Sequence, residues 1–266
     1  MSPFRPVALV VAAALALPVA ATAADTSIAT VLGGSQRSTE NRARDQYRHP
    51  AETLKFFGVK PGMTVVEVSP SGGWYTEILA PYLKDKGTYY AAHSNPASSE
   101  RAAKSVETFK AKLASNPAYA NVKLTAFGKG AYEIAPAGSA DAVLTFRNVH
   151  SWHMNGFAPE AFKSFATALK KGGTLGVVEH RLPEDKPDEM QMKSGYMKRS
   201  AVIKMAENAG FRLAGESKIN ANPKDTHDYP KGVWTLPPNY AEGDTDKAKY
   251  SAIGESDRMT LRFVKK

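Results

Sequence analysis

From residue 50 onward, short apolar runs alternate with longer segments in which apolar residues recur every three or four positions. A short apolar run bounded by turn residues is typical of a buried strand, and the longer spacing is typical of a helix with one buried side. Strands that alternate with helices of roughly ten to fifteen residues predict an α/β protein with a Rossmann-like, doubly wound and mostly parallel sheet of about seven strands. The runs place strands at residues 63–68, 88–92, from 122, 141–146 and 174–179.

Proline and glycine mark where several of the helices begin and end. Pro50 and Gly58 bracket a short helix, and Pro159 and Gly172 bracket a later one. Pro81 lies inside a third helix that begins near residue 74, and it should kink or shorten that helix. Two further helical stripes are Ala102, Val106, Phe109 and Leu113, and then Val202, Met205, Ala206 and Ala209 before Gly210.

The end of the chain follows a different pattern. Residues 211–217 predict a strand, and residues 259–264 alternate strictly, with Leu261 and Phe263 on the apolar side. Alternation predicts a strand with one polar side, as antiparallel strands often have. The sheet should therefore contain one late antiparallel strand.

Two long segments lack either pattern. Residues 25–46 are polar and mixed, and they predict a partly ordered lead-in to the domain. Residues 220–250 are rich in proline, asparagine and aspartate, which predicts a long ordered excursion over the surface. In that excursion His227 and Asp228 are expected to be a solvated pair.

The first residues have the layout of a secretory signal. Arg5 precedes an apolar run at residues 7–20, and Ala21, Thr22 and Ala23 form a small-residue cleavage site. An uncleaved membrane anchor is the alternative, but the run is short for a bilayer, which needs about 20 residues. We expect a signal peptide at residues 1–24, one domain at residues 25–266, and a periplasmic or secreted protein.

Composition excludes some chemistry. The 266 residues include no cysteine, so thiol nucleophiles and thiolate metal sites are excluded. The formal net charge is +9, and removal of Arg5 with the signal leaves +8. Such a charge suits nucleic acid or anionic lipid, but the basic residues are scattered at helical spacing and no recognition helix is evident. We therefore expect a solvated basic surface, no nucleic acid and no stable membrane insertion after cleavage.

Polar residues that could bind a ligand or take part in a reaction follow three of the predicted strands. The strand that ends in Glu67 and Val68 leads into a loop of small residues, where open α/β sheets bind their ligands. Arg147, Asn148 and His150 follow the fourth strand. Glu179, His180 and Arg181 follow the fifth strand, which should lie beside the fourth.

Four segments in this order resemble a known family. They are VEVSPSGGWYTEILAPYL at residues 66–83, DAVLTFRNVHSW at 141–152, GGTLGVVEHR at 172–181 and GESDRMTLRF at 254–263. The sequence resembles the predicted class I S-adenosylmethionine-dependent methyltransferases of bacteria, in particular an exported subgroup of unassigned substrate. The resemblance implies a class I methyltransferase-like domain, and S-adenosylmethionine as its cofactor.

In the wider superfamily the loop after the first strand reads acid, x, G, x, G, x, G. Glu67 matches the acid, Ser69 and Ser71 replace the first two glycines, and Gly73 matches the third, with Gly72 beside it. The resemblance implies that these loop residues bind the cofactor. Serine tolerates such turns at a strain of about 1 kcal/mol. The family also places an acid after the second strand to bind ribose hydroxyls; here the resemblance implies His93 or Asn95 instead.

For methyl transfer, the residues after the fourth strand are the candidates. We expect His150 to take a proton from the acceptor, Arg147 to hold an anionic substrate, and Asn148 to take part in the same site. Structural alternatives stay open: Arg147 paired with Asp141 or Glu179, Asn148 as a turn cap, Gly72 and Gly73 as turn glycines, and Trp152, Tyr196 and Met197 as packing residues. A metal held by His150, His153, Glu179 and His180 is a further alternative, although no metal is expected.

These patterns leave two main functions. The first is a methyltransferase that acts on an unidentified small molecule. The alternative is a periplasmic binding or accessory protein that keeps the fold without transfer activity, because fold does not fix function. The sequence assigns neither the methyl acceptor nor the oligomeric state.

Overall fold

The computed structural model describes Met1 and residues 27–266. Apart from Met1, the segment predicted as a signal peptide therefore lies outside the described residues, and its cleavage remains a prediction. Within the described part of the chain, no helix combines the length and the apolar character that crossing a bilayer requires.

The centre of the molecule is the predicted mostly parallel sheet. Only β8 runs against its neighbours β5 and β7, which confirms the late antiparallel strand, and the two-residue strand β6 (Met197–Lys198) pairs with the end of β5. In spatial order the main strands are β3 (Val122–Phe127), β2 (Thr88–Ser94), β1 (Thr64–Val68), β4 (Ala140–Phe146), β5 (Leu169–Leu182), β8 (Arg258–Lys265) and β7 (Phe211–Ser217).

The central strands are apolar because helices cover both faces of the sheet. Val65, Val66 and Val68 of β1 are fully buried, and Val66 is in register with Val143 of β4. A strand buried on both faces reads as a continuous apolar run, which is why these strands could be predicted.

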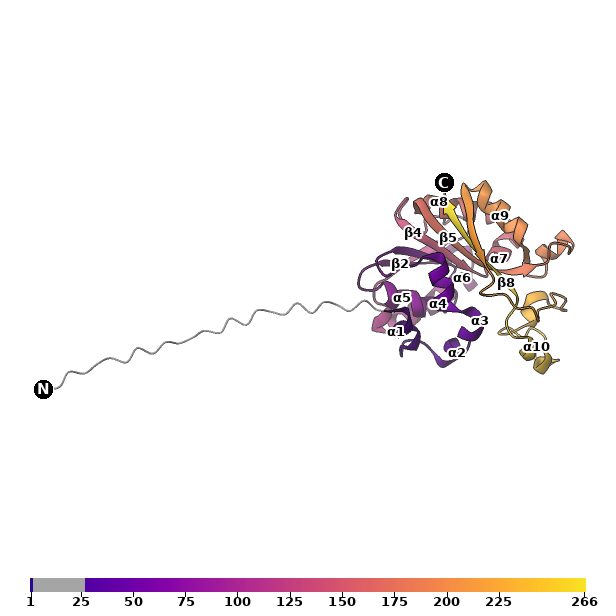
Figure 1. The fold of residues 1–266 in the computed structure, drawn as a ribbon, viewed down its shortest axis with the longest axis horizontal. Coiled ribbons are helices and arrows are strands. Elements are labelled where there is room, and N and C mark those ends of the chain that lie inside the picture. The colour runs from indigo at the N-terminus through magenta and orange to yellow at the C-terminus, as the bar shows by residue number, and fades with distance from the viewer. Residues whose placement is uncertain (2–26) are drawn as a thin grey trace.

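Helices form one layer on each face of the sheet (Figure 1). One layer holds α7 (Val149–Met154), α8 (Ala158–Ala168) and α9 (Arg199–Asn208). The other holds α1 (Ile28–Gly33), α4 (Pro50–Phe57), α5 (Thr76–Leu83) and α6 (Glu100–Ala114).

Most predicted helix boundaries are confirmed. Pro50 is the first residue of α4 and Gly58 ends it in the left-handed conformation. Pro81 lies inside α5, which is only 8 residues long. The predicted end of α8 at Gly172 is wrong, because Leu169 already pairs with Ala140 in the sheet.

The lead-in is more regular than expected. Besides α1 it forms the short helices α2 (Thr39–Arg42) and α3 (Asp45–Arg48), and Arg48 is buried. Short 3-10 turns connect other elements: η1 (Pro96–Ser98), η2 (Pro117–Tyr119), η3 (Asp188–Met192) and η4 (Gly232–Thr235).

The excursion at residues 220–250 is ordered, as predicted, and it leads through η4 to α10 (Lys247–Ile253). Part of it is buried: the Asp225 carboxylate accepts hydrogen bonds from the Tyr196 hydroxyl at 3.0 and 3.1 Å and from the Asp257 N–H at 2.7 Å. The expectation of a solvated His227 is wrong, since its Nε2 lies 3.6 Å from the Asp257 carboxylate and its side chain is only 13% exposed.

Candidate functional site

A hollow of about 650 Å³ opens at the carboxyl ends of β1 to β4, a size typical of small-molecule sites. We call it the serine-lined hollow. Its lining includes Ser69 and Ser71 after β1, Ser94 and Asn95 at the end of β2, Gly128 after β3, and Asn148 and Ser151 after β4. Parallel strands bring these residues together because their carboxyl ends share one edge of the sheet.

The loop after β1 turns as a glycine-rich loop would. Ser69, Ser71 and Gly73 have φ angles of 55°, 52° and 79°, all in the left-handed region that favours glycine. The two serines therefore carry the backbone strain predicted from the sequence. Within the described residues neither serine hydroxyl has a hydrogen-bond partner, and both residues line the hollow.

Glu67 is not among the residues that line the hollow. Its buried carboxylate accepts a hydrogen bond from the Tyr89 hydroxyl at 2.5 Å and a long one from the Thr76 hydroxyl at 3.5 Å. Burial raises the pKa of Glu67 to about 7, against the opposing effects of Tyr89 and Arg147. Glu67 thus links β1, β2 and α5 behind the loop, which differs from the direct cofactor contact that we predicted.

Three other predicted cofactor residues also lie outside the lining. A Cβ atom at Gly73 would lie 3.0 Å from Lys112 and 3.1 Å from Phe109 of α6, which is tighter than ordinary contact, so that helix packs closely against the loop. The ring centre of His93 lies 4.8 Å from that of Phe109, with the two rings tilted. The Nε2 atom of His93 lies 3.2 Å from the Ser71 carbonyl oxygen, and burial lowers the pKa of His93. Gly72 is exposed. Gly72, Gly73 and His93 shape or flank the loop, whereas Ser69, Ser71 and Asn95 face the hollow.

The two asparagines of the hollow hold the backbone around it. Asn95 accepts a hydrogen bond from Ala97 N–H and donates one to the Lys129 carbonyl. Asn148 makes no capping bond to α7; its amide donates to the Val68 carbonyl at 3.2 Å. The alternative of Asn148 as a turn cap is therefore wrong, because its side chain joins the ends of β1 and β4.

Arg147, although adjacent to Asn148, lines a different and smaller cavity of about 90 Å³. We call it the arginine-lined cavity. Arg44 and Arg48 from the N-terminal segment, His180 from β5, Trp234 from the excursion, and Glu255 and Ser256 before β8 also border it. Sequence reasoning missed Arg44, Arg48, Glu255 and Ser256, although the four-residue spacing of Arg44 and Arg48 was a signal that they share one side.

The predicted alternative of a buried ion pair at Arg147 is wrong. Asp141 pairs with Lys170, and Glu179 accepts a hydrogen bond from His150. Among the described residues, the Arg147 guanidinium has no hydrogen bond or ion pair. Burial lowers the pKa of Arg147 to about 10, with Glu255 acting in the opposite direction and Arg258 and Arg44 adding to the decrease. Its φ of 64° is a further strained position.

The two histidines lie side by side beneath the excursion, with ring centres 5.3 Å apart. His150 Nδ1 is 3.0 Å from the Glu179 carboxylate, and His180 Nδ1 is 2.5 Å from the Ser256 hydroxyl. Burial lowers the pKa of His180 well below its ordinary value, and the charges of His150, Arg147 and Arg258 lower it further. His150 lines neither the hollow nor the cavity, whereas His180 borders the cavity.

Part of the suggested metal set converges. His150, Glu179 and His180 each offer one possible ligand atom, and these atoms lie within 4.8 Å of one another. His153 is not part of this set.

Trp152 packs against Phe127 and Phe165, as a packing residue would.

Tyr196 and Met197 are also fully buried. These two residues therefore belong to the core, as packing residues would.

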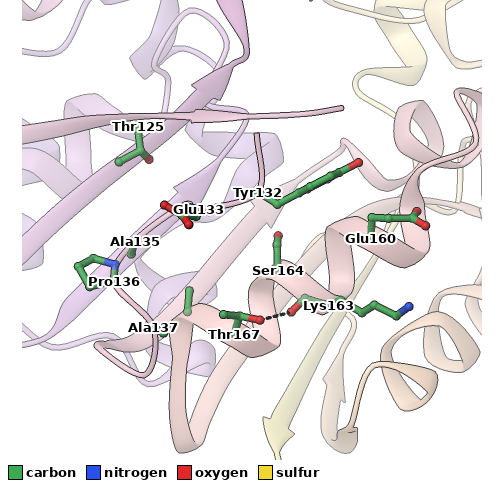
Figure 2. A pocket seen from close by; sticks show the side chains of 11 residues that line it. Thr125, Tyr132, Glu133, Ala135, Pro136, Ala137, Glu160, Lys163, Ser164 and Thr167 are labelled. Carbon is green, nitrogen blue, oxygen red and sulfur yellow. Dashed lines mark hydrogen bonds between the residues drawn. The ribbon is translucent and has the colours of Figure 1, made fainter. Parts of the chain in front are cut away.

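A third hollow of about 690 Å³ lies between α8 and residues 132–137 (Figure 2). Figure 2 shows Glu160, Lys163, Ser164 and Thr167 on α8, with Thr125 and Tyr132 on the opposite side. The connection between β3 and β4 contains no helix in the structure, so this side of α8 stays partly uncovered. It lies beside α8 and not at the carboxyl ends of the strands, where open α/β sheets bind their ligands, so the serine-lined hollow is the stronger candidate site.

Compared with models of protein families and with curated protein sequences, the chain matches none. It resembles solved structures, including a SAM-dependent methyltransferase from Aquifex aeolicus, with a TM-score of 0.56 and 18% identity over 84% of this chain and 92% of the other. The chain has the fold of the class I methyltransferases. A Galdieria sulphuraria protein assigned as a sarcosine dimethylglycine methyltransferase gives a TM-score of 0.57 and 13% identity, over 85% of this chain and 87% of the other.

This methyltransferase fold also carries other chemistry. The [4+2]-cyclase SpnF aligns with a TM-score of 0.56 and 14% identity, over 88% of this chain and 84% of the other. At such identities the likeness concerns the fold alone, so the function of this chain has to be argued from its own site.

Proposed function

We propose that this protein is an S-adenosylmethionine-dependent methyltransferase that acts on a small molecule. The observation that carries the proposal is the serine-lined hollow, where the left-handed turns at Ser69 and Ser71 bring the backbone after β1 to the edge of a space of about 650 Å³. Such a loop permits close approach of a ligand to the backbone. The free hydroxyls of Ser69 and Ser71 are available to hydrogen-bond that ligand.

The residues around the hollow fit the cofactor by their chemistry. Serine hydroxyls and the exposed backbone at the ends of β1 and β2 can bind the amino acid and ribose parts of S-adenosylmethionine, and Phe127 and Phe157 offer apolar surface for the adenine. When bound, the cofactor supplies an activated methyl group. The chain itself then has to position the acceptor for in-line attack and receive its proton.

We place the acceptor beside Asn148, between the hollow and the arginine-lined cavity. His180 is the base in this proposal, because it borders the cavity and its ring, whose pKa is lowered by burial, is neutral before the acceptor binds. The negative charge of a bound anionic acceptor would raise that pKa toward the range in which the ring takes up a proton. His150, which we first expected to be the base, is a positioning residue here. Its contact with Glu179 fixes the ring that packs against His180.

Calorimetric titration with S-adenosylmethionine and S-adenosylhomocysteine tests the cofactor site. We expect saturable binding, and at least tenfold weaker binding by Ser151→Trp, because Ser151 is exposed at the hollow and a large ring there would fill it. Thr108→Trp is the matched control, since Thr108 is exposed on α6 outside the lining. No binding by the unmodified protein at millimolar ligand would refute the proposal and favour an accessory protein.

We also propose that the protein works in the periplasm or outside the cell, on the basis of the predicted signal at residues 1–24. Cell fractionation with N-terminal sequencing tests this independently of activity. A mature N-terminus near residue 24 or 25 is the expected result, and an intact N-terminus in the cytosolic fraction would contradict it.

A further inference from the structure

The arginine-lined cavity holds far more positive than negative charge. Arg44, Arg48 and Arg147 line it, and Arg258 contacts the same Glu255 that Arg44 and Arg48 contact. One carboxylate is therefore shared by three arginines, and within residues 27–266 Arg147 has no acidic partner. The other fully buried carboxylate nearby, Glu179, is already bonded to His150 and to the backbone N–H groups of His150 and His180.

Two of these arginines also have N–H donors that are not used in their contact with Glu255. Arg44 and Arg48 contact Glu255 only through Nε, at 2.7 and 3.0 Å, so among the described residues their terminal nitrogens have no protein acceptor. Arg48 is 3% exposed and stacks over Trp74 at 4.7 Å, which fixes its position. The terminal nitrogens of a fixed guanidinium form a fork that matches carboxylate and phosphate oxygens.

Burying like charges without partners is costly, and natural sites offset the cost with a ligand of opposite charge. We infer that the arginine-lined cavity binds a small oxyanion group, a carboxylate or a phosphate, carried by the methyl acceptor. The assignment of this anionic group to a methyl acceptor rests on the proposed function, whereas the binding of an anion in the cavity does not depend on it. The cavity of about 90 Å³ has room for such a group, because a single water needs about 10–15 Å³.

A cation in the same place is disfavoured by the same charges. His150, Glu179 and His180 converge closely enough to hold a metal. However, His180 borders the same cavity as Arg44, Arg48 and Arg147. Three guanidinium charges at one cavity act against a metal ion and favour an anion.

The experiment uses inorganic phosphate and malonate as separate probes at constant ionic strength, with calorimetry and thermal unfolding as readouts. We expect saturable binding of at least one probe and a raised unfolding temperature. Arg147→Gln should weaken that binding at least tenfold. Without ligand, Arg147→Gln should unfold at a higher temperature than the unmodified protein, because a partly buried charge without an acidic partner is removed while the strained backbone stays the same.

Arg212→Gln is the matched control, since Arg212 is exposed on β7 and should leave both readouts unchanged. The inference is overturned if neither probe binds, or if Arg147→Gln binds as tightly as the unmodified protein. A zinc-dependent rise in unfolding temperature that His180→Asn abolishes, without anion binding, would also overturn it.

S-adenosylhomocysteine separates this inference from the proposed function. With S-adenosylhomocysteine at saturation, the probe affinity should stay within twofold, because the two ligands occupy different hollows. Competition between them would assign the arginines to the carboxylate of the cofactor and refute an acceptor site. Anion binding without any binding of S-adenosylhomocysteine would refute the proposed function and leave the anion site intact.

Discussion

At the scale of single residues, the loop after β1 shows how far one side chain can be predicted. The sequence identified Ser69 and Ser71 as serines at glycine positions, and both adopt the left-handed backbone that glycine would. The same comparison placed Glu67 at the cofactor, but its carboxylate is turned to Tyr89. Backbone conformation follows from the local pattern, whereas the direction of a side chain depends on which partner folds against it.

Glu67 should make stability depend on pH. Its folded-state pKa of about 7 is above the ordinary value of 4.5, so between these pH values the folded state holds a proton that the unfolded state has released. The free energy of unfolding should therefore fall as pH rises through this window, by about 3 kcal/mol at most. Glu67→Gln should remove that fall, as measured by urea unfolding at several pH values from 4.5 to 8.

The control for Glu67 is Glu52→Gln, because Glu52 is exposed on α4. It should keep the pH dependence of the unmodified protein. If Glu67→Gln and the unmodified protein lose stability in parallel between pH 4.5 and pH 7, the carboxyl of Glu67 is not the group responsible.

At the scale of elements, the excursion at residues 220–250 depends on one buried carboxylate. Asp225 accepts hydrogen bonds from the Tyr196 hydroxyl and from the N–H groups of His227 and Asp257. Asp225→Ala would leave these buried donors without a partner, so we expect a loss of about 3 kcal/mol in the free energy of unfolding. Limited proteolysis should then cut first within residues 220–250.

Asp228→Ala is the matched control, since Asp228 is exposed in the same loop. It should change stability by less than about 0.5 kcal/mol. An Asp225→Ala protein as stable and as protease-resistant as the control would show that the excursion is held by other contacts.

At the scale of the whole molecule, two tiers of stability are expected. Strands β1 and β4 are buried between both helical layers, whereas the excursion is held by a small cluster in which its Val233 joins Leu182 and Tyr196. Regions with few buried apolar contacts open more easily than the core. In hydrogen exchange with mass spectrometry, amides of residues 220–250 should exchange much faster than those of β1 and β4, and equal protection would contradict the expectation.

The sheet could be predicted from the sequence, and the arginine-lined cavity could not. A strand buried on both faces leaves a local pattern, as at residues 141–146, which form β4 within one residue of the expected limits. The cavity is assembled from Arg44, Arg147, His180 and Glu255, which lie far apart in the chain. No local pattern records that four segments meet, so only the fold reveals the site.

The placement of β8 has a consequence for biosynthesis. This strand comes after β7 in the chain, yet it lies between β5 and β7, and among the strands that the structure describes it alone joins β7 to the sheet. During translation, β5 and β7 are complete before their shared partner emerges, so each presents an unsatisfied backbone edge in the meantime. The nascent chain should therefore need protection from self-association by a chaperone until residues 258–265 leave the ribosome.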